Sequence, residues 1–238
     1  MFLDQLDLPG IGEIQSKKLS TEIAMKELDK AISRLKASKA PGSNGFPKEW
    51  YRVFGEELKL LFLRSFNYIH KEYRTSPSWK EAIITLIPKE NKTKENCAKE
   101  AIITLIPKEN KTKENCAKYR PISILNVDYK LYTSIITKRI STFITDVIDE
   151  YQTGFIIGRQ SHDSIRRTLH IIQSITKSNL ALISIDAEKT FDRVNWGFLY
   201  QMLEKFGFTE DSIRCIKEIC QKPTARIKVN GSLMKRFS

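Results

Sequence analysis

The chain has 238 residues, enough for one large domain or two subdomains with a real core, and its 41% hydrophobic content excludes disorder by composition. Lysine and arginine number 40 against 28 acidic residues, so the formal net charge is +12. No run approaches the roughly 18 apolar residues of a membrane-spanning helix, and the start of the chain lacks the apolar core of a secretory signal.

The four cysteines, Cys97, Cys116, Cys215 and Cys220, have no spacing typical of structural zinc or of a disulfide framework. We therefore expect reduced thiols in an intracellular protein of the cytoplasm and/or nucleus. The basic excess indicates a polyanion partner, because lysine and arginine release condensed counterions when they neutralise phosphates. A generically basic, soluble surface explains the same charge equally well.

Residues 20–37 are predicted to form an amphipathic helix, with Ser20 as its cap and apolar residues recurring near the helical period. The Pro41-Gly42 pair ends this helix and opens a glycine-bearing turn over residues 41–46. The turn either approaches a nucleic-acid backbone or simply joins two helices. A second helix is predicted over residues 48–73, and we interpret its many aromatic side chains as core packing.

A third helix is predicted over residues 128–148, with Lys130, Lys138 and Arg139 on or beside its outer face. A loop over residues 152–160 follows, in which two glycines flank an aromatic residue. The remaining predicted elements are, in order, a helix at 163–177, a buried strand at 180–185, helices at 196–206 and 211–220, and a strand at 225–229. Many helices over a few short strands predict an α+β fold, and we find no linker that would divide it into independent domains.

A 19-residue unit, residues 81–99, recurs without a change as residues 100–118. Identity this complete is not the divergent periodicity of a solenoid and is typical of a recent duplication or an assembly artefact. Either strand 82–87 or strand 101–106 can pair with the segment around Arg120, but one place in a sheet cannot hold both. We expect the second copy to form the strand because its connection is shorter, although each doubling of loop length costs only about 0.6 kcal/mol. The surplus copy should then bulge out or add an edge strand.

Asp186 ends the predicted strand at 180–185, and an aromatic residue, Phe191, and a second carboxylate, Asp192, follow within six residues. A carboxylate at the end of a buried strand projects from a rigid base, and magnesium takes oxygen ligands from one or two carboxylates together with substrate phosphates. The pattern therefore predicts a divalent-cation site that handles phosphates. The alternative is that Asp186 merely ends a strand and Asp192 caps the helix that begins near Trp196.

Six blocks of sequence follow one another along nearly the whole chain. They are Lys39-Ala-Pro-Gly-Ser-Asn-Gly-Phe-Pro47, Trp79 with Ile-Thr-Leu-Ile-Pro-Lys, Tyr119-Arg-Pro-Ile-Ser-Ile-Leu-Asn-Val-Asp-Tyr-Lys130, Gln152-Thr-Gly-Phe-Ile-Ile-Gly-Arg-Gln160, the Asp186 segment, and Ala225-Arg-Ile-Lys-Val-Asn-Gly231. Each is a weak signal alone, but six in order form a specific one. Together they resemble the reverse transcriptase of non-LTR (LINE-type) retrotransposons.

The resemblance implies RNA-directed DNA synthesis with Mg²⁺, on an RNA template and a DNA primer, from deoxynucleoside triphosphates. It implies that Asp186 is catalytic and a metal ligand, and that Phe191 is the steric gate under the incoming sugar. Arg120 looks like the fingers residue that contacts the triphosphate, which suits a guanidinium because it donates two parallel hydrogen bonds to a phosphate. Without the resemblance, Arg120 reads as a surface arginine and Phe191 as a core aromatic.

A lysine of the Ile-Pro-Lys block is expected beside the triphosphate. The choice of the second copy makes this Lys108, with Lys89 as its displaced twin. Arg159 and Lys39 are the candidates for nucleic-acid contact. Asn44 stands where the family usually has aspartate, which keeps the turn but removes a charge.

The resemblance assigns residues 1–160 to a fingers-like region and residues 161–238 to a partial palm of a right-hand polymerase. The family pattern continues beyond the last block to an Asp-Asp hairpin, and this sequence has no Asp-Asp pair. A two-metal site needs carboxylates from both sides to hold its ions. We therefore expect a fragment truncated before the second catalytic aspartate block, inactive alone.

Three functions stay open from the sequence. The first is a reverse transcriptase domain that uses Asp186, Phe191 and Arg120. The second is a non-catalytic, basic remnant that binds RNA or DNA, with no membrane partner. The third is a relic without a selected role.

Overall fold

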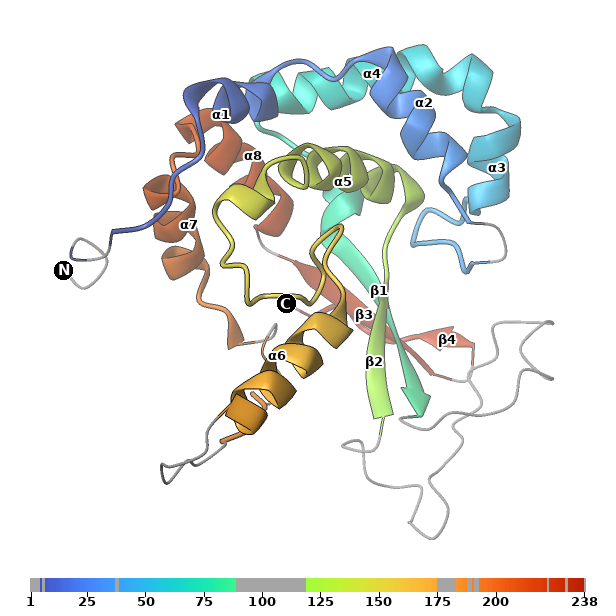
Figure 1. Cartoon of the computed structure of the whole chain (residues 1–238). Coiled ribbons are helices and arrows are strands. Elements are labelled where there is room, and N and C mark those ends of the chain that lie inside the picture. Colours follow the sequence, from blue (N-terminus) through green and yellow to red (C-terminus); the bar gives the residue numbers. More distant parts are fainter. Residues whose placement is uncertain are drawn as a thin grey trace, which may run out of the picture. The chain divides into compact units, whose positions relative to one another are not determined.

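The computed structural model describes residues 5, 7–36, 39–88, 119–174, 183–187, 190, 193–221, 223–229 and 231–237. Its contacts divide the chain into two compact units. Unit 1 comprises Met1–Thr21 and Ile136–Arg214, and unit 2 comprises Glu22–Ile135 and Cys215–Ser238. The divisions fall inside helices α5 (Val127–Ile140) and α8 (Glu210–Cys220). The helix-rich composition with one small sheet confirms the predicted α+β class (Figure 1).

Unit 2 contains a four-stranded sheet in the order β2-β1-β3-β4 (Figure 1). Strand β1 (Glu81–Pro88) pairs antiparallel with β2 (Tyr119–Ile124), with Pro88 opposite Tyr119. On its other side β1 pairs parallel with β3 (Thr224–Val229), and β3 pairs antiparallel with the short β4 (Ser232–Leu233). The last predicted strand therefore shares a sheet with residues assigned to the fingers, whereas the predicted division was a single cut after residue 160. The assignment of the two ranges to fingers and palm stays a prediction.

The strand beside β2 is the first copy of the duplicated unit, so the choice of the second copy was wrong for this arrangement. The first copy is anchored directly before β1, because Trp79 is buried and its Nε1 donates to Asp128 Oδ2 at 2.8 Å. Lys80 adds an ion pair to Glu218 at 2.9 Å. These contacts outweigh a loop-entropy difference of about 0.6 kcal/mol per doubling. The second copy lies outside the described residues.

The helices of unit 2 are shorter than the sequence predicted. Only α2 (Met25–Ser33) corresponds to the predicted helix at 20–37, and Ser20 ends the preceding helix α1 (Glu13–Ser20) instead of capping α2. The predicted helix at 48–73 is two helices, α3 (Lys48–Val53) and α4 (Gly55–Glu72). The break falls at Phe54, whose backbone leaves the helical region with φ of −95° and ψ of 11°, and the next residue, Gly55, begins α4 buried against Ile32 of α2. A short 3₁₀ turn, η2 (Pro77–Lys80), leads into β1.

Aromatic side chains form much of the core of unit 2, but core packing was correct for only some of the aromatic residues predicted at 48–73. Tyr51 and Phe66 are buried, whereas Phe54 and Tyr68 are 45% and 55% exposed. Phe66 of α4 lies between Trp79 and Tyr132, with ring centroids 5.9 and 5.4 Å away, and all three are buried. Tyr51 of α3 joins them through Phe62. Such tilted and edge-to-face contacts are the favourable geometries for aromatic rings.

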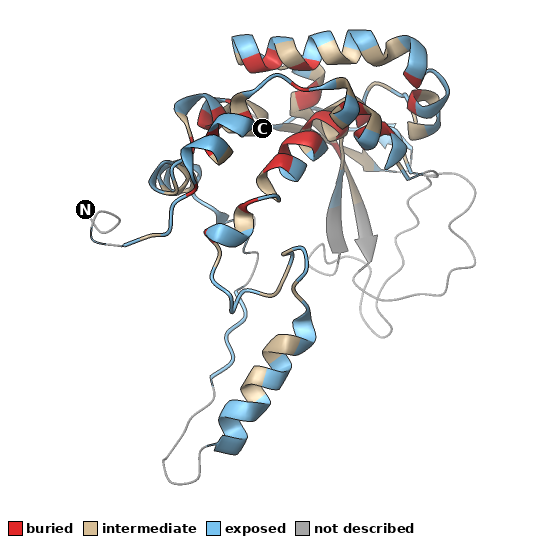
Figure 2. Ribbon diagram, turned by 45° about the horizontal axis from the view of Figure 1, so that its top comes forward, coloured by how far each residue is buried: buried red, intermediate tan, exposed pale blue. Residues whose placement is uncertain are grey.

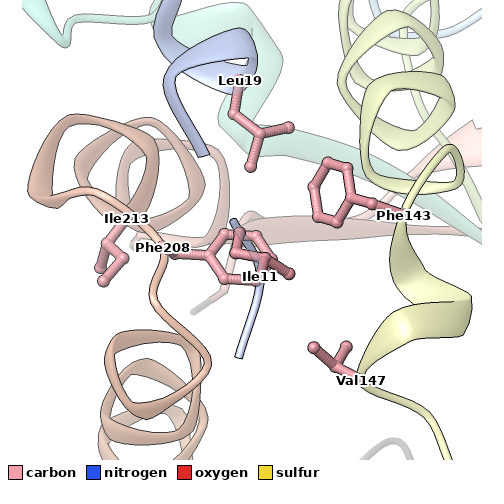
Figure 3. Close-up of a cluster of buried hydrophobic side chains, with 6 residues drawn as sticks. All are labelled: Ile11, Leu19, Phe143, Val147, Phe208 and Ile213. Atoms are coloured by element: carbon pink, nitrogen blue, oxygen red, sulfur yellow. The ribbon is translucent and has the colours of Figure 1, made fainter. Parts of the chain in front are cut away.

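Unit 1 has a separate hydrophobic cluster that α1, the end of α5 and the loop before α8 build. The predicted helix at 128–148 is α5 followed by the 3₁₀ turn η4 (Ile144–Asp146). The Ile11 N–H donates to Phe206 O at 2.8 Å, and the Thr209 N–H donates to Ser16 Oγ at 2.8 Å, so hydrogen bonds surround the cluster. Figure 3 shows its six buried side chains, Ile11, Leu19, Phe143, Val147, Phe208 and Ile213.

Two further helices of unit 1 lie where the sequence placed them, α6 (Ser161–Ser174) and α7 (Trp196–Lys205). Asn195 caps α7 by accepting from the Phe198 N–H at 3.0 Å. Helix α6 has no buried residue and is coloured exposed or intermediate along its length (Figure 2). Within the described ranges, no helix is both long and apolar enough to cross a membrane.

Candidate nucleotide and nucleic-acid site

The segment around Asp186 is described over residues 183–187 and is extended without a strand partner. Ile183 and Ile185 are 78% and 87% exposed, and Asp186, directly after Ile185, is also exposed. The prediction of a buried strand was therefore wrong for these residues. An apolar run forms a buried strand only where neighbouring strands accept its backbone hydrogen bonds, and none of β1 to β4 does so.

The residues that follow Asp186 in the sequence line a pocket of about 600 Å³. Ala187 and Thr190 contribute to one part of its lining, and Asn195 and α7 contribute another. Its described lining is mostly apolar with one cation, Arg193, and the hollow is open to solvent. Phe191, the predicted gate, lies outside the described residues, so its relation to this pocket stays a prediction.

The number of ligand residues near Asp186 determines which kind of metal site can form there. In the part of the chain that the structure describes, no three His, Cys, Asp or Glu residues gather as metal ligands. Asp186 therefore offers a single carboxylate, which is too few for an ion held by the protein alone. It suffices for Mg²⁺ that brings other ligands from a substrate's phosphates.

Arg120 lies in β2, the edge strand of the sheet in unit 2, where its backbone pairs with Ile87 of β1. This pairing brings the end of β1, at Pro88, beside Arg120. The sheet thus places Arg120 next to the point where the Ile-Pro-Lys block continues. Lys89 and Lys108, the two candidate lysines of that block, lie outside the described residues.

The turn at 41–46 is held against the start of α5 by Asn126, which is 1% exposed. Asn126 Oδ1 accepts from the Asn44 N–H at 3.2 Å and from Ser43 Oγ at 3.3 Å, and its Nδ2 donates to Ser78 O at 3.0 Å. Gly42 packs so closely that a Cβ there would lie 2.2 Å from Asn126 Oδ1. These contacts fix the shape of the turn, and no sequence pattern indicates this role of Asn126.

Asn44 completes this turn through both atoms of its amide. Its Oδ1 accepts from the Phe46 N–H at 3.2 Å and its Nδ2 donates to Tyr51 Oη at 3.2 Å. Burial, followed by the nearby Asp128 carboxylate, raises the pKa of Tyr51 to about 12, so Tyr51 stays protonated. An aspartate at position 44 would lack the amide donor.

Cations gather beside the turn. Lys39 precedes it and is exposed, while Lys48 begins α3. Burial, together with the positive charge of Lys48, lowers the pKa of Lys130 on α5.

Arg159, a predicted nucleic-acid contact, is engaged within its own loop in unit 1. Its guanidinium donates to Ile148 O at 3.0 Å, to Gln152 O at 2.8 Å and to Asp149 O. These bonds fix the loop that carries Phe155, whose side chain is 98% exposed on a backbone with φ of 62°. Positive φ at a bulky residue is strained, and such strain often marks a functional site.

Arg139 was predicted on or beside the outer face of its helix, but it is 4% exposed. Its Nη1 donates to Leu19 O at 3.2 Å and to Thr21 O at 2.7 Å, so it satisfies carbonyls that follow α1. The charge of an arginine favours exposure in any sequence pattern, and only the fold reveals these acceptors. Of the described predicted site residues, Asp186 and Arg159 belong to unit 1, and Arg120 and Lys39 to unit 2.

A family model described as reverse transcriptase (RNA-dependent DNA polymerase) matches residues 106–238. The match begins inside the second copy of the duplicated unit and covers more than half of the chain. It includes Arg120, Arg159 and Asp186.

Three known proteins are similar to the chain over most of its length. The transposon TX1 uncharacterized 149 kDa protein of Xenopus laevis is 28% identical over 95% of the chain and 16% of its own length. The probable RNA-directed DNA polymerase from transposon BS of Drosophila melanogaster is 29% identical over 81% of the chain and 19% of its own length. The RNA-directed DNA polymerase from mobile element jockey, also of Drosophila melanogaster, is 23% identical over 88% of the chain and 21% of its own length. The chain thus spans about a fifth or less of each relative.

Proposed function

Because this chain belongs to the reverse transcriptase (RNA-dependent DNA polymerase) family, we propose that it takes part in RNA-directed DNA synthesis by a retrotransposon. The chain is a retrotransposon reverse transcriptase domain by sequence, of the non-LTR type. The observation that carries the proposal is the single family match over residues 106–238.

Members of this family act on a nucleic-acid template with nucleotide substrates and use divalent metal ions. For this chain we propose an RNA template, a DNA primer, deoxynucleoside triphosphates and Mg²⁺. Phosphoryl transfer needs positioning and charge neutralisation more than a covalent catalyst. Arg120 would hold the triphosphate, with Lys89 or Lys108 beside it, and Phe191 would exclude a ribose 2′-hydroxyl.

Asp186 is the proposed metal ligand and catalytic residue. Its carboxylate is exposed, and no three His, Cys, Asp or Glu residues gather among the described residues, which fits an ion shared with the phosphates of a bound nucleotide. Mg²⁺ there would neutralise charge on the phosphates. Lys39 and Arg159 are the proposed nucleic-acid contacts, and the exposure of Lys39 supports the first of these.

Extension of a DNA primer annealed to an RNA template tests this proposal. The wild-type chain, Asp186→Asn and Asp163→Asn are compared with Mg²⁺ and all four deoxynucleoside triphosphates. Asp163 is the matched control, because it is an aspartate of unit 1 in the first turn of α6, its side chain is 46% exposed, and it has no proposed role in the site. Extension by the wild type and the control, lost in Asp186→Asn, supports the enzyme. It would also overturn the expectation that the chain is inactive alone.

The alternative is a non-catalytic domain that binds RNA or DNA. The net charge of +12 favours it. Retention of the same RNA on a filter without any extension supports this function. Extension that persists in Asp186→Asn would refute the assigned role of Asp186.

A further inference from the structure

Helix α4 (Gly55–Glu72) packs against the rest of unit 2 with one face only. Gly55 packs against Ile32 of α2, and Phe66 belongs to the aromatic core. Figure 2 shows α4 as the long helix at the top, where exposed residues recur along its whole length. The buried residues of α4 lie within about 100° of one another around the helix axis, and they are Gly55, Phe66, Ile69 and His70.

The opposite face of α4 carries a regular line of exposed residues. Its members follow one another at intervals of four, three, four and three residues, which is the spacing of a coiled-coil contact line. They are Glu57, Leu61, Arg64, Tyr68 and Lys71. Leu60 is exposed beside this line, and we call these six residues together the outer seam of α4.

The outer seam is apolar at its centre. Leu60, Leu61 and Tyr68 are 59%, 56% and 55% exposed. Val53 and Phe54, which immediately precede α4, are also exposed and extend the apolar surface past the beginning of the helix. A contiguous exposed apolar patch bordered by charged residues is typical of a surface that binds another protein.

The charges of the outer seam are ordered along the helix, with Glu57 near its beginning and Arg64 and Lys71 toward its end. Among the described residues, none forms an ion pair with any of these three side chains. An acidic first half and a basic second half make the seam complementary to itself when a second copy runs antiparallel. An anionic membrane surface fits less well, because Glu57 lies beside the apolar residues.

A two-fold axis between Leu60 and Leu61 brings all of these groups into register. Leu60 of one copy then lies opposite Leu61 of the other. Glu57 and Arg64 are each three residues from the axis, so the acid of one copy faces the base of the other. Val53 and Tyr68 are each seven residues from the axis and meet in the same way. In a two-fold pair every such contact forms twice.

We propose that two copies of this chain associate through the outer seam of α4 as an antiparallel, two-fold symmetric helix pair. Leu60 and Leu61 form its centre, and two ion pairs between Glu57 and Arg64 flank this centre. One helix pair is a small interface beside the roughly 1,200 Å² of total surface that stable complexes bury, so the dimer should dissociate on dilution. The association involves unit 2 alone and is independent of the proposed function.

Charge reversal tests the pairing in the full chain. Sedimentation velocity over the micromolar range should show the wild type passing from monomer to dimer as its concentration rises. Glu57→Arg and Arg64→Glu each place like charges opposite one another twice in the pair, so each should weaken dimerisation about tenfold or more. The variant that carries both changes should dimerise as the wild type does.

An equal mixture of the two single variants provides a stricter test. In a mixed pair the substituted side chains face each other as opposite charges, and so do the two unchanged ones, so the mixture should dimerise although neither variant does so well alone. Glu204→Arg in α7 and Arg166→Glu in α6 are the matched controls, because both residues are exposed helical charges of unit 1. Neither control should change dimerisation.

Thermal unfolding should be the same in all of these variants, because each substituted side chain is exposed. A wild-type chain that stays monomeric would refute the helix pair. A dimer that neither reversal weakens would refute it as well, because another surface would then hold the two copies together. Retention of a monomeric chain on anionic lipid vesicles would assign the outer seam to a membrane surface and would equally overturn the pairing.

Discussion

At the scale of single residues, the turn at 41–46 depends on a fit between one glycine and one amide. A Cβ at Gly42 would meet the Asn126 side chain at 2.2 Å and its backbone N and Cα at 2.6 Å. The Asn126 backbone begins α5 and cannot move without shifting that helix. The shape of the turn therefore depends on Gly42, although its φ is ordinary.

Gly42→Ala should lower the free energy of unfolding by about 3 kcal/mol, the upper range for overpacking a fixed site. Gly45→Ala is the matched control, since Gly45 has φ of 78° but no neighbour within 4 Å of a Cβ. It should cost about 1 kcal/mol, from backbone strain alone. Urea unfolding of both variants measures the difference, and equal losses would contradict the close fit.

Glu218 should make stability depend on pH. Burial acts to raise the pKa of Glu218, but Lys80 and two hydrogen bonds from Thr75 together hold it below the ordinary value of 4.5. A carboxyl whose pKa is lowered by folding stabilises the protein above its unfolded pKa, and this stabilisation is lost as the pH falls through its folded pKa.

Glu218→Gln should therefore lower the free energy of unfolding at pH 7 by about 1 to 2 kcal/mol. The difference from wild type should narrow as the pH falls from about 5 to about 3. Glu210→Gln, at an exposed pair with Arg214, should change stability by less than about 0.5 kcal/mol at either pH. Urea unfolding across this range checks both, and a pH-independent loss in Glu218→Gln would contradict the assignment.

Residue types and order predicted some individual roles but not others. Asp186, Arg120 and Lys39 were chosen because their types suit phosphates and metals, and their roles remain predictions. The buried Arg139 and the loop-fixing bonds of Arg159 depend on carbonyls that only the folded chain brings near. Asn126 was missed because a single amide carries no periodic or charge signal.

At the scale of elements, α5 and α6 show where periodicity is sufficient. Both have 14 residues and apolar residues at helical spacing, and both were predicted to within a few residues of their beginnings. Leu131 of α5 is fully buried, whereas Leu169 of α6 is 51% exposed. Periodicity indicates that a face is apolar, but the neighbours that cover it are a property of the fold.

Leu131→Ala should thus destabilise the protein by about 3 kcal/mol, through lost transfer energy and a cavity. Leu169→Ala in α6 should cost less than about 1 kcal/mol, because half of the side chain already contacts water. Chemical unfolding of the two variants provides the measurement. A large loss in Leu169→Ala would mean that another part of the chain covers α6.

The duplicated strand was the least predictable element. Its type and its partner β2 were correct, but loop length alone favoured the second copy, whereas Trp79 and Lys80 anchor the first. The helix break at Phe54 was also missed, because the apolar pattern continues through it and the packing of the neighbouring Gly55 against Ile32 is a property of the fold. The hydrophobic pattern predicts whether a segment is a helix or a strand more reliably than it predicts the residues at which the element begins and ends.

Deletion of residues 81–99 and deletion of residues 100–118 yield the same sequence. This single-copy chain shortens the connection between β1 and β2 from 30 residues to 11. Its free energy of unfolding should rise by about 0.9 kcal/mol from loop closure alone. Equilibrium unfolding compares the two chains, and a single-copy chain less stable than the wild type would show that both copies contribute contacts.

At the scale of the whole molecule, the net charge and the order of the six sequence blocks were the features that carried predictions. Block order was sufficient to predict the family, which the match over residues 106–238 bears out. The α+β class followed from the ratio of helices to strands. The pairing of β3 with β1 was not predictable, since nothing in either strand specifies a parallel partner so distant in sequence.

The net charge of +12 predicts salt-sensitive binding to nucleic acid. If about six phosphates are neutralised, affinity for a single-stranded RNA should fall on the order of 10³-fold between 50 and 200 mM salt. Filter binding at several salt concentrations measures the slope. Affinity that does not change with salt would refute a phosphate-based interaction, and Lys39→Ala should reduce the slope by about one phosphate contact.

The parallel pairing of β1 with β3 also determines how long β1 stays incompletely paired during translation. More than 130 residues separate Pro88 from Thr224, so the ribosome completes β3 roughly 7 to 30 seconds after β1. Until β3 is made, β1 can pair only with β2, and the backbone hydrogen-bonding groups on its other edge have no strand partner. Nascent chains of this protein therefore expose an aggregation-prone strand edge to chaperones for most of their translation. Slow codons between the two strands would prolong that exposure.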